Sequence, residues 1–311
     1  MVPKSYAIIG SGAVGALYGS MLARHGRSVH FLMRSDYECV QENGWKIESP
    51  WGDFQLPSVN AYASADELPP CDVTIVATKS TGNDALPELL QPPTRDGGVV
   101  LILQNGLGVE QRVAEFFEPQ RIFGGCCFLC SNRVGPGHIK HLDFGRIVFG
   151  PLVADTASMQ TAQEICQQMS DAGIDVQTSD DLNMVRWRKL MWNITFNGLS
   201  VALDASTDQL INDPASLALS RDIITEVYQA ALACGADIAE HWIEKTIDNT
   251  RNMVPYDSSM RLDFLAGRPM ELDAILASPI AAAKDAGAAM PKTEMLLQVL
   301  TYMQAAKRAD A

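Results

Sequence analysis

A short glycine-rich run near the start of the chain has the spacing that binds a phosphorylated dinucleotide. Glycines occupy the first, third and sixth places of Gly10-Ser11-Gly12-Ala13-Val14-Gly15. Between a strand and a helix, the first glycine permits a tight turn and the second lets the backbone approach a pyrophosphate. The third lets the helix pack closely on the strand, and the free amides at the start of the helix face the anion. We therefore expect these six residues to bind a cofactor, with a glycine-rich turn of no special function as the alternative.

The residue type after the next apolar run distinguishes two cofactors. A protein that binds NAD usually has Asp or Glu at this place, to hold the ribose 2′-hydroxyl. This chain has Met33-Arg34-Ser35, and a guanidinium suits a 2′-phosphate. Asp36 lies close by, and Arg34 could also be an ordinary surface arginine. The pattern favours NADP (NADPH) over NAD.

Two polar residues follow further apolar runs that are typical of buried strands. Lys79 comes shortly after the run 72–77, and Asn105 comes shortly after the run 98–103. In an open parallel sheet, ligands lie outside the carboxyl ends of the strands. We expect both residues to lie where cofactor or substrate binds, although either could be a loop residue without a function.

A polar stripe in the second half of the chain could carry acid–base chemistry. Lys189, Asn193 and Asn197 are spaced i, i+4 and i+8 within the otherwise apolar stretch 185–198. On a regular helix they share one face over roughly 12 Å. A polar stripe on a buried helix must face internal partners or a cavity. Desolvation disfavours the charged form of a lysine and so lowers its pKa, which makes the ammonium group a suitable proton donor near neutral pH. Alternatively, the lysine side chain extends to solvent at a domain edge.

The residues Cys127, Cys130, His138 and His141 suggest zinc at first sight. The spacing between the Cys pair and the His pair is too short for a zinc finger, and alternating strand positions would not converge. We expect no metal, and we interpret the cysteines as small core residues.

The glycine run must lie between a strand and a helix, and the flanking sequence predicts both. The apolar run Ser5–Ile9 precedes it, a helix-like stretch Ala16–His25 follows, and Ser28–Met33 reads as a second strand. This is a βαβ unit of about 30 residues. Antiparallel strands are expected over 121–150, a helix over 158–172 and a last strand over 174–178.

From residue 180 onward the sequence shows only helical patterns. The predicted fold class is therefore α/β, with an N-terminal Rossmann-type doubly wound sheet over residues 1–179 followed by an all-α C-terminal domain over 180–311. A chain of 311 residues with 47% hydrophobic and 20% charged residues is long enough for two packed domains.

The overall charge and cysteine content limit the classes of function. A net charge of −13 argues against a nucleic-acid binder, because phosphate-backbone affinity needs clustered Lys and Arg. The seven cysteines are scattered and no secretory leader is apparent, so we expect a cytoplasmic protein. The apolar stretch 6–23 is interrupted by glycines and is interpreted as strand, turn and helix, with no membrane association.

These residues, in this order, resemble the 2-dehydropantoate 2-reductase family, also called ketopantoate reductase. The resemblance runs over nearly the whole chain and rests on the glycine run and on the motifs Ala77-Thr78-Lys79, Gln104-Asn105-Gly106-Leu107-Gly108, Gly135-Pro136-Gly137, Trp187-Arg188-Lys189-Leu190 and Met270-Glu271-Leu272-Asp273, together with Arg34, Asn193, Asn197 and Ser259.

The resemblance implies an NADPH-dependent oxidoreductase that reduces 2-dehydropantoate, a small 2-keto acid, to pantoate in pantothenate and coenzyme A biosynthesis. It implies Lys189 as general acid with Glu271 as its partner. It also implies that substrate or nicotinamide is held by Asn105, Asn193, Asn197 and Ser259. A homodimer formed through the helical domain is compatible with the resemblance.

Two departures from the family pattern bear on the substrate. Family members often continue the second Asn with Pro-Leu-Thr, whereas Gly198-Leu199-Ser200 follows Asn197 here. Asn is also common near the positions of Thr207 and Tyr256. Lost amide groups change which acid a pocket accepts. A reductase of a different 2-keto acid therefore stays an alternative, as does a non-catalytic NADP-binding sensor.

Overall fold

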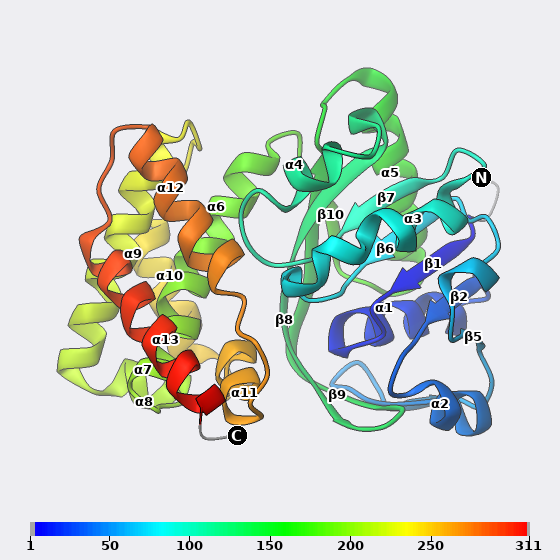
Figure 1. The fold of residues 1–311 in the computed structure, drawn as a ribbon, viewed down its shortest axis with the longest axis horizontal. Helices are drawn as coiled ribbons and strands as arrows, with labels where there is room; N and C mark the ends of the chain where they lie inside the picture. The colour runs from blue at the N-terminus through cyan, green and yellow to red at the C-terminus, as the bar shows by residue number, and fades with distance from the viewer. Residues whose placement is uncertain (1–3, 310–311) are drawn as a thin grey trace. The chain divides into compact units, whose positions relative to one another are not determined.

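The computed structural model describes residues 4–309, which form two compact units. One unit contains the chain up to Gln104 together with Val109–Leu182, and we call it the sheet unit. The other contains Asn105–Gly108 together with the chain from Asn183 onward, and we call it the helical unit. In Figure 1 the sheet unit runs from blue to green, and most of the helical unit runs from yellow-green to red. The four-residue loop 105–108 thus belongs to the unit built mainly from later residues.

The centre of the sheet unit is a parallel sheet whose strands follow the order β5-β2-β1-β6-β7-β8. The strands that form its parallel part are β1 (Tyr6–Ile9), β2 (Val29–Leu32), β5 (Asn60–Tyr62), β6 (Val73–Val76), β7 (Val99–Ile102) and the start of β8 (Ile122–Gly135). All four residues of β1 are buried, as expected of a central strand covered on both faces. This order confirms the predicted doubly wound Rossmann-type sheet.

The remaining strands extend this sheet with a long hairpin (Figure 1). The hairpin consists of β8 (Ile122–Gly135) and β9 (His138–Pro151), which are antiparallel as predicted. Further strands pair with β9 or its neighbour: β3 (Trp45–Glu48), β4 (Phe54–Leu56) and β10 (Val176–Thr178). β10 confirms the predicted last strand, whereas β3, β4 and β5 were not predicted.

Helices connect the strands of the sheet unit. They are α1 (Ala13–Arg24), α2 (Tyr37–Asn43), α3 (Leu86–Thr94), α4 (Val109–Ala114) and α5 (Thr156–Asp171), with short 3₁₀ turns η1 (Ala65–Glu67), η2 (Ser80–Ala85) and η3 (Pro119–Arg121). One core joins strands and helices, and its largest buried side chains include Phe31, Trp45 and Phe149. Burying such a side chain contributes about 1.5–3 kcal/mol.

The helical unit contains no strand among the residues described from 183 to 309, which confirms the predicted all-α part. Its helices are α6 (Leu182–Trp192), α7 (Gly198–Ala202), α8 (Thr207–Asn212), α9 (Pro214–Ala233), α10 (Trp242–Asn252), α11 (Ser259–Leu265), α12 (Ser278–Asp285) and α13 (Pro291–Ala309). A second core fills this unit, with Trp187, Leu190 and Phe196 fully or almost fully buried.

Two π-helical turns interrupt the helices, and one of them corrects the sequence prediction. The turn η4 (Asn193–Asn197) separates α6 from α7, and η5 (Asp273–Ala277) precedes α12. A regular α-helix over 185–198 was expected, but the i→i+5 turn breaks its 3.6-residue period within the polar stripe. π turns are often found at functional sites. The position of η4 on the polar stripe therefore favours a functional role for the stripe.

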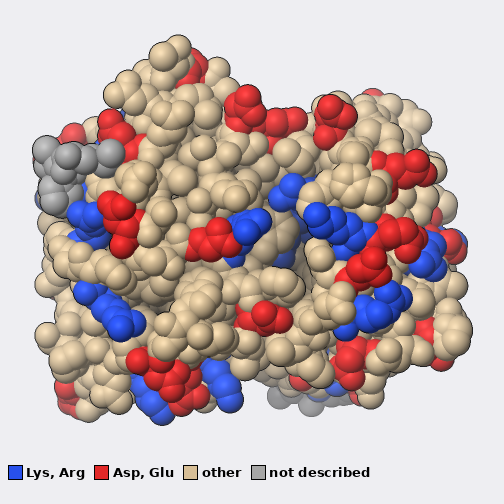
Figure 2. Space-filling view, turned by 180° about the vertical axis from the view of Figure 1, so that it is seen from behind, with Lys and Arg blue, Asp and Glu red and all other residues tan. Residues whose placement is uncertain are grey.

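The surface carries charges of both signs. On the face shown in Figure 2, basic and acidic side chains are interspersed, and neither sign covers the face continuously. Among the surface ion pairs of the described residues are Arg221–Glu244 and Arg146–Asp175. Within residues 4–309, no helix is long and apolar enough to cross a membrane.

Candidate active site

The glycine run forms the turn between β1 and α1, and each glycine has a distinct environment. Gly10 has a φ of +97°, and a Cβ there would lie 2.5 Å from the backbone nitrogen of Thr78. A Cβ at Gly15 would lie 2.3 Å from the carbonyl oxygen of Gly10. A Cβ at Gly12 would meet nothing within 4 Å. Gly10 and Gly15 are thus required by the fold, whereas Gly12 faces open space.

The start of α1 presents backbone donors beside this open space. The first bond of the helix ladder runs from the Ala16 amide to the Gly12 carbonyl, at 2.9 Å. The amides of Ala13 and Val14 therefore precede the ladder and point out of the helix end. The Ser11 hydroxyl donates to the Leu32 carbonyl at 2.9 Å and ties the turn to the end of β2. This geometry is that of an anion-binding helix start.

Arg34 and Asp36 lie in the turn after β2 and have different surroundings. Arg34 is exposed and makes no hydrogen bond or ion pair with any residue of the described range. Asp36 is only 4% exposed. Its carboxylate pairs with Arg133, and its other oxygen accepts from the Gly137 amide at 3.4 Å. Asp36 therefore anchors the β8–β9 hairpin, and Arg34 is the residue available to a ligand.

Lys79 lies at the same edge of the sheet as the glycine run. Ile9 pairs with Leu32 on one side and with Val76 on the other, so the three carboxyl ends coincide. Lys79 then precedes η2. Gln104, which was not singled out as a site residue, donates its side-chain amide to Thr78 Oγ1 at 3.0 Å and so ties the end of β7 to this turn.

Asn105 belongs to the helical unit although it directly follows the sheet. The Leu107 amide donates to the Ala274 carbonyl in η5 at 2.9 Å. Gly106 has a φ of +104°, and a Cβ there would lie 2.4 Å from the Cβ of Ala274. The Asn193 side-chain amide donates to Asn105 Oδ1 at 3.3 Å. The loop 105–108 thus brings Asn105 to the polar stripe.

The two π turns and this loop form one cluster inside the helical unit. The turns η4 and η5 pack against each other. Lys189 lies in the last turn of α6, is half-buried, and places its Nζ 5.1 Å from the centre of the Trp192 ring. Glu271 is 4% exposed and lies two residues before η5. The predicted catalytic residues, Lys189 and Glu271, therefore lie on elements next to those that carry the predicted binding amides.

Asn197 has an unused acceptor in this cluster. Its side chain is almost completely buried, and its Oδ1 has no hydrogen-bond partner among the residues described. The Ser200 hydroxyl donates to the Asn197 carbonyl at 3.0 Å. A buried amide oxygen without a partner is costly, so a ligand that donates a hydrogen bond to it would gain free energy.

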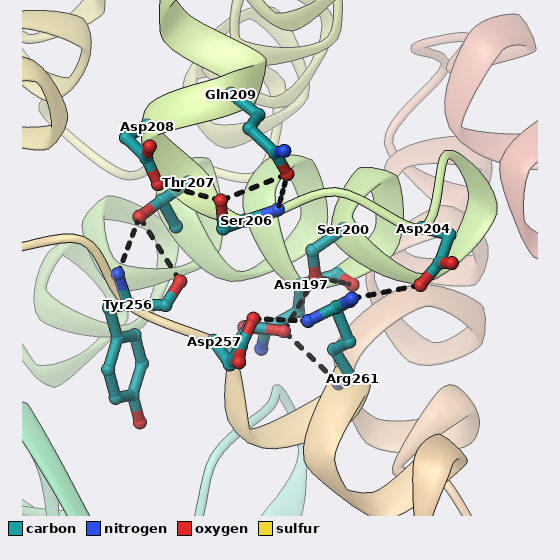
Figure 3. Close-up of polar contacts among 11 residues, drawn as sticks. Asn197, Ser200, Asp204, Ser206, Thr207, Asp208, Gln209, Tyr256, Asp257 and Arg261 are labelled. Atoms are coloured by element: carbon teal, nitrogen blue, oxygen red, sulfur yellow. Dashed lines mark hydrogen bonds and ion pairs between the residues drawn. The ribbon is translucent and has the colours of Figure 1, made fainter.

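Ser258 caps the start of α11 and contacts Ser200, which is labelled together with Asn197 in Figure 3. Its Oγ shares a hydrogen bond of 2.7 Å with Ser200 Oγ and accepts from the Arg261 amide at 3.2 Å. Because the proton of Ser200 is given to Asn197, Ser258 is the donor of the shared bond. The sequence pointed to Ser259, which is half-buried at the first position of α11. Ser258, the buried cap, was missed.

Thr207 and Tyr256 are linked through the backbone (Figure 3). The Thr207 hydroxyl donates to the Tyr256 carbonyl at 3.2 Å and accepts from the Tyr256 amide at 3.3 Å. The Thr207 amide donates to the same carbonyl at 3.3 Å. We call these three bonds the Thr207 clamp. Because both functions of its hydroxyl are used, Thr207 holds the segment before α11 in place.

Arg261 fixes the same segment from the other side. Its guanidinium pairs with Asp257 and, at 2.9 Å, with Asp204, as Figure 3 shows. Burial opposes its charge, but the two carboxylates prevail and raise the pKa of Arg261 above its usual value. Arg261 is thus a charged anchor for the segment that leads into α11.

The cysteine and histidine pairs do not converge. Cys127 and Cys130 are buried on β8. His138 lies 3.0 Å from Glu48 Oε1, and His141 Nδ1 lies 2.8 Å from Ser49 Oγ. Within residues 4–309, no group of three or more His, Cys, Asp or Glu side chains is arranged to hold a metal ion.

A hollow of about 440 Å³ lies at the opposite edge of the sheet. It is lined by residues near the amino ends of β1, β6 and β7, including Ser5, Asp72 and Gly98. In open parallel sheets, ligands bind outside the carboxyl ends of the strands. We therefore do not include this hollow in the candidate site.

Comparisons with known proteins identify the same family in both halves of the chain. The family model described as ketopantoate reductase PanE/ApbA matches residues 6–154, and the model of its C-terminal part matches residues 181–304. A 2-dehydropantoate 2-reductase of Nostoc sp. is 42% identical, over 99% of this chain and 98% of the relative.

Solved structures lead to the same family. The crystal structure of 2-dehydropantoate 2-reductase from Geobacter metallireducens is 41% identical with a TM-score of 0.92, covering 96% of this chain and 99% of that one. The enzyme from Methylococcus capsulatus is 30% identical with a TM-score of 0.85, covering 97% of both chains. Since family models match both units and close relatives match nearly end to end, the chain belongs to the ketopantoate reductase family.

Proposed function

We propose that this protein reduces 2-dehydropantoate to pantoate with NADPH, a step of pantothenate and coenzyme A biosynthesis. The observation that carries the proposal is the cluster in the helical unit, where Lys189 and the amides of Asn105, Asn193 and Asn197 occupy adjoining elements. The 42% identity to a reductase of this name supports the same substrate class. The protein is accordingly an oxidoreductase that acts on a small 2-keto acid.

The sheet unit is suited to a nicotinamide dinucleotide. The open space at Gly12 and the outward amides of Ala13 and Val14 fit a pyrophosphate, and Gly10, Ser11 and Gly15 shape the turn. Arg34 has no competing partner among the described residues and fits a 2′-phosphate, which favours NADPH over NADH. Lys79 and Asn105 complete the proposed cofactor contacts.

The chemistry of the chain is that of a general acid beside a keto group. Bound NADPH supplies a hydride to the keto carbon. Lys189 stabilises the developing alkoxide and transfers a proton from Nζ to that oxygen, which gives the 2-hydroxy acid. Glu271 is the proposed partner that orients the Lys189 ammonium.

The polar residues of the cluster have the complementary role of holding the acid. Asn193 and Asn197 offer amide groups, and Ser259 offers a hydroxyl at the start of α11. The unused Oδ1 of Asn197 suits a hydroxyl donor of the substrate. Holding the acid in this geometry converts a bimolecular encounter into an oriented reaction.

A reductase of a different 2-keto acid is the second candidate, and the Thr207 clamp favours it. The Thr207 hydroxyl is committed to the Tyr256 backbone and is not offered to a substrate. A pocket with fewer hydrogen-bonding groups discriminates less strongly for the substrate hydroxyl.

The cytoplasmic location and a homodimer through the helical unit stay predictions.

An assay of NADPH oxidation against a keto-acid panel tests the proposal. We expect kcat/KM to be highest with 2-dehydropantoate, lower with 2-ketoisovalerate and lowest with pyruvate, with pantoate as the product found by mass spectrometry. A higher kcat/KM with another acid supports the second candidate. NADPH binding without turnover of any acid would indicate the non-catalytic sensor and refute both enzymatic assignments.

A further inference from the structure

A second arginine, from a distant part of the sequence, contacts the turn that carries Arg34. Arg133 is on β8, two residues before the end of the strand. Its Nη1 donates to Ser35 Oγ at 3.0 Å and to the Asp36 carboxylate. Ser35 directly follows Arg34. The hairpin therefore brings a second guanidinium to the end of β2.

Asp36 fixes Arg133 in this place. The Asp36 carboxylate is buried and is itself held by the Gly137 amide at the turn of the hairpin. The tip of the hairpin also contacts α2, where the Cys39 thiol lies 3.6 Å from the Pro136 carbonyl. A guanidinium held on a buried, hydrogen-bonded carboxylate loses little further freedom when it binds a ligand.

The rest of the Arg133 guanidinium is available. The side chain is 44% exposed, and only Nη1 is used in contacts with residues 4–309. Its Nε and Nη2 donors face no protein acceptor in that range. Arg34 likewise has no partner there. Arg34 directly precedes Ser35 in the chain and Arg133 donates to Ser35, so the turn after β2 has two arginines whose guanidinium groups keep donors without a partner in residues 4–309.

A phosphate monoester explains why two such groups would be needed. It carries about −1.5 to −2 charges near neutral pH and has three acceptor oxygens. Arg34 alone leaves part of that charge uncompensated in a chain whose net charge is −13. Two guanidinium groups match the charge, and their forks match the oxygens.

We propose that Arg133 is a second residue that binds the 2′-phosphate of NADPH, together with Arg34. The Ser35 hydroxyl donates to the Asp36 carboxylate at 3.0 Å and accepts from Arg133, so it helps to hold Arg133 in place. This proposal rests on the proposed function, since it assumes NADPH as the cofactor. It also assigns a role to Asp36: the carboxylate that could have held a ribose hydroxyl instead holds Arg133. Selectivity for NADPH over NADH would therefore come from two elements, the turn after β2 and the β8–β9 hairpin.

Titration calorimetry with two adenosine ligands tests the role of Arg133 without any turnover. The probes are adenosine 2′,5′-bisphosphate and 5′-AMP, which differ only in the 2′-phosphate. We expect Arg133→Gln to weaken the bisphosphate about tenfold and to change 5′-AMP less than twofold. Arg133→Lys, which keeps the charge but loses the fork, should fall between wild type and Arg133→Gln.

Arg146→Gln is the matched control, because Arg146 lies on the same hairpin, is paired with Asp175 at 2.8 Å and carries the same charge. It should leave the ratio of the two affinities unchanged. A ratio altered equally by both variants, or by neither, would overturn the role of Arg133. If wild type itself bound the two probes equally, the NADPH assignment would fail as well, so the two failures are distinguishable.

Discussion

At the scale of single residues, the structure gives different surroundings to two neighbouring side chains, Arg34 and Asp36. Arg34 and Asp36 both follow β2. An arginine there suits the 2′-phosphate of NADP, and a carboxylate there suits the ribose 2′-hydroxyl of NAD. The carboxylate of Asp36 is engaged by Arg133 and by the Gly137 amide, whereas Arg34 has no partner within residues 4–309. Sequence spacing alone could not predict this, because the partners of Asp36 lie about a hundred positions away.

The first prediction concerns Arg34. Arg34→Ala should raise the Kd of NADPH about 10- to 100-fold, because a charge-assisted contact to the 2′-phosphate is lost. The Kd of NADH should change less than about twofold. Fluorescence titration of both dinucleotides measures these values. Equal losses for NADPH and NADH would contradict the proposed contact to the 2′-phosphate.

At the scale of elements, the glycine turn shows how far a motif can be interpreted. The motif predicted the turn, the helix and the second strand, and β1, α1 and β2 confirm them. It also predicted close packing at Gly15 and open backbone at Gly12, and both are observed. Such local features are predictable because they follow from the space around a single Cβ.

Gly12 and Gly15 provide a matched pair of variants. Gly15→Ala should destabilise the protein by at least about 1–3 kcal/mol, because its Cβ would overlap the Gly10 carbonyl. Gly12→Ala should alter stability by less than about 1 kcal/mol, since its Cβ meets nothing within 4 Å. Urea unfolding measures both.

NADPH affinity separates the two roles further. Gly12→Ala should weaken NADPH more than about tenfold while the fold persists, since a methyl group would occupy the space proposed for the pyrophosphate. A folded Gly12→Ala variant with wild-type affinity for NADPH would remove Gly12 from the cofactor site.

Other elements could not be predicted from the sequence. The polar stripe was placed on a regular helix, but η4 makes a π turn at Asn193–Asn197. Nothing in the residue types of this stretch signals an i→i+5 turn, and the elements that contact it, η5 and the loop 105–108, lie far away in the sequence. The strands β3 and β4 were likewise missed, since both are short and β3 joins the sheet only through its long-range pairing with β9, while β4 pairs with β3 at the edge.

The Thr207 clamp gives an element-scale prediction. Thr207→Val keeps the shape but leaves the Tyr256 amide without its acceptor, so it should cost about 1–3 kcal/mol of stability. KM for the keto acid should rise more than kcat falls, because the segment that the clamp holds leads directly into α11, which begins with Ser259. Thr207→Ser retains the hydroxyl and should restore KM. If Val and Ser variants behaved alike, the clamp would not position the site.

At the scale of the whole molecule, the chain passes between the two units at three places. It leaves the sheet unit after Gln104, returns at Val109, and leaves again after Leu182. The sequence predicted one boundary near residue 180 and gave no sign that the loop 105–108 belongs to the helical unit. That assignment depends on Ala274, which lies far along the chain and accepts the Leu107 amide.

The loop yields a prediction about how the units are built. Gly106→Ala should destabilise the protein by about 2–4 kcal/mol, because a positive φ and a collision with Ala274 act together. Gly108 also has a positive φ, of +81°, but a Cβ there would meet nothing within 4 Å. Gly108→Ala should therefore cost about half as much stability. Thermal unfolding compares them. Equal losses would show that packing on Ala274 contributes nothing.

The most direct test of the proposed reaction is steady-state turnover of Lys189→Ala with NADPH and saturating 2-dehydropantoate. Lys245→Ala serves as the control, because Lys245 lies in the same unit with its Nζ 4.5 Å from the centre of the Trp242 ring. We predict that kcat falls about 10²- to 10⁴-fold in Lys189→Ala while NADPH binding persists, and that Lys245→Ala retains wild-type kcat. A Lys189→Ala variant that binds NADPH and turns over at the wild-type rate would contradict the assignment of Lys189 as the general acid.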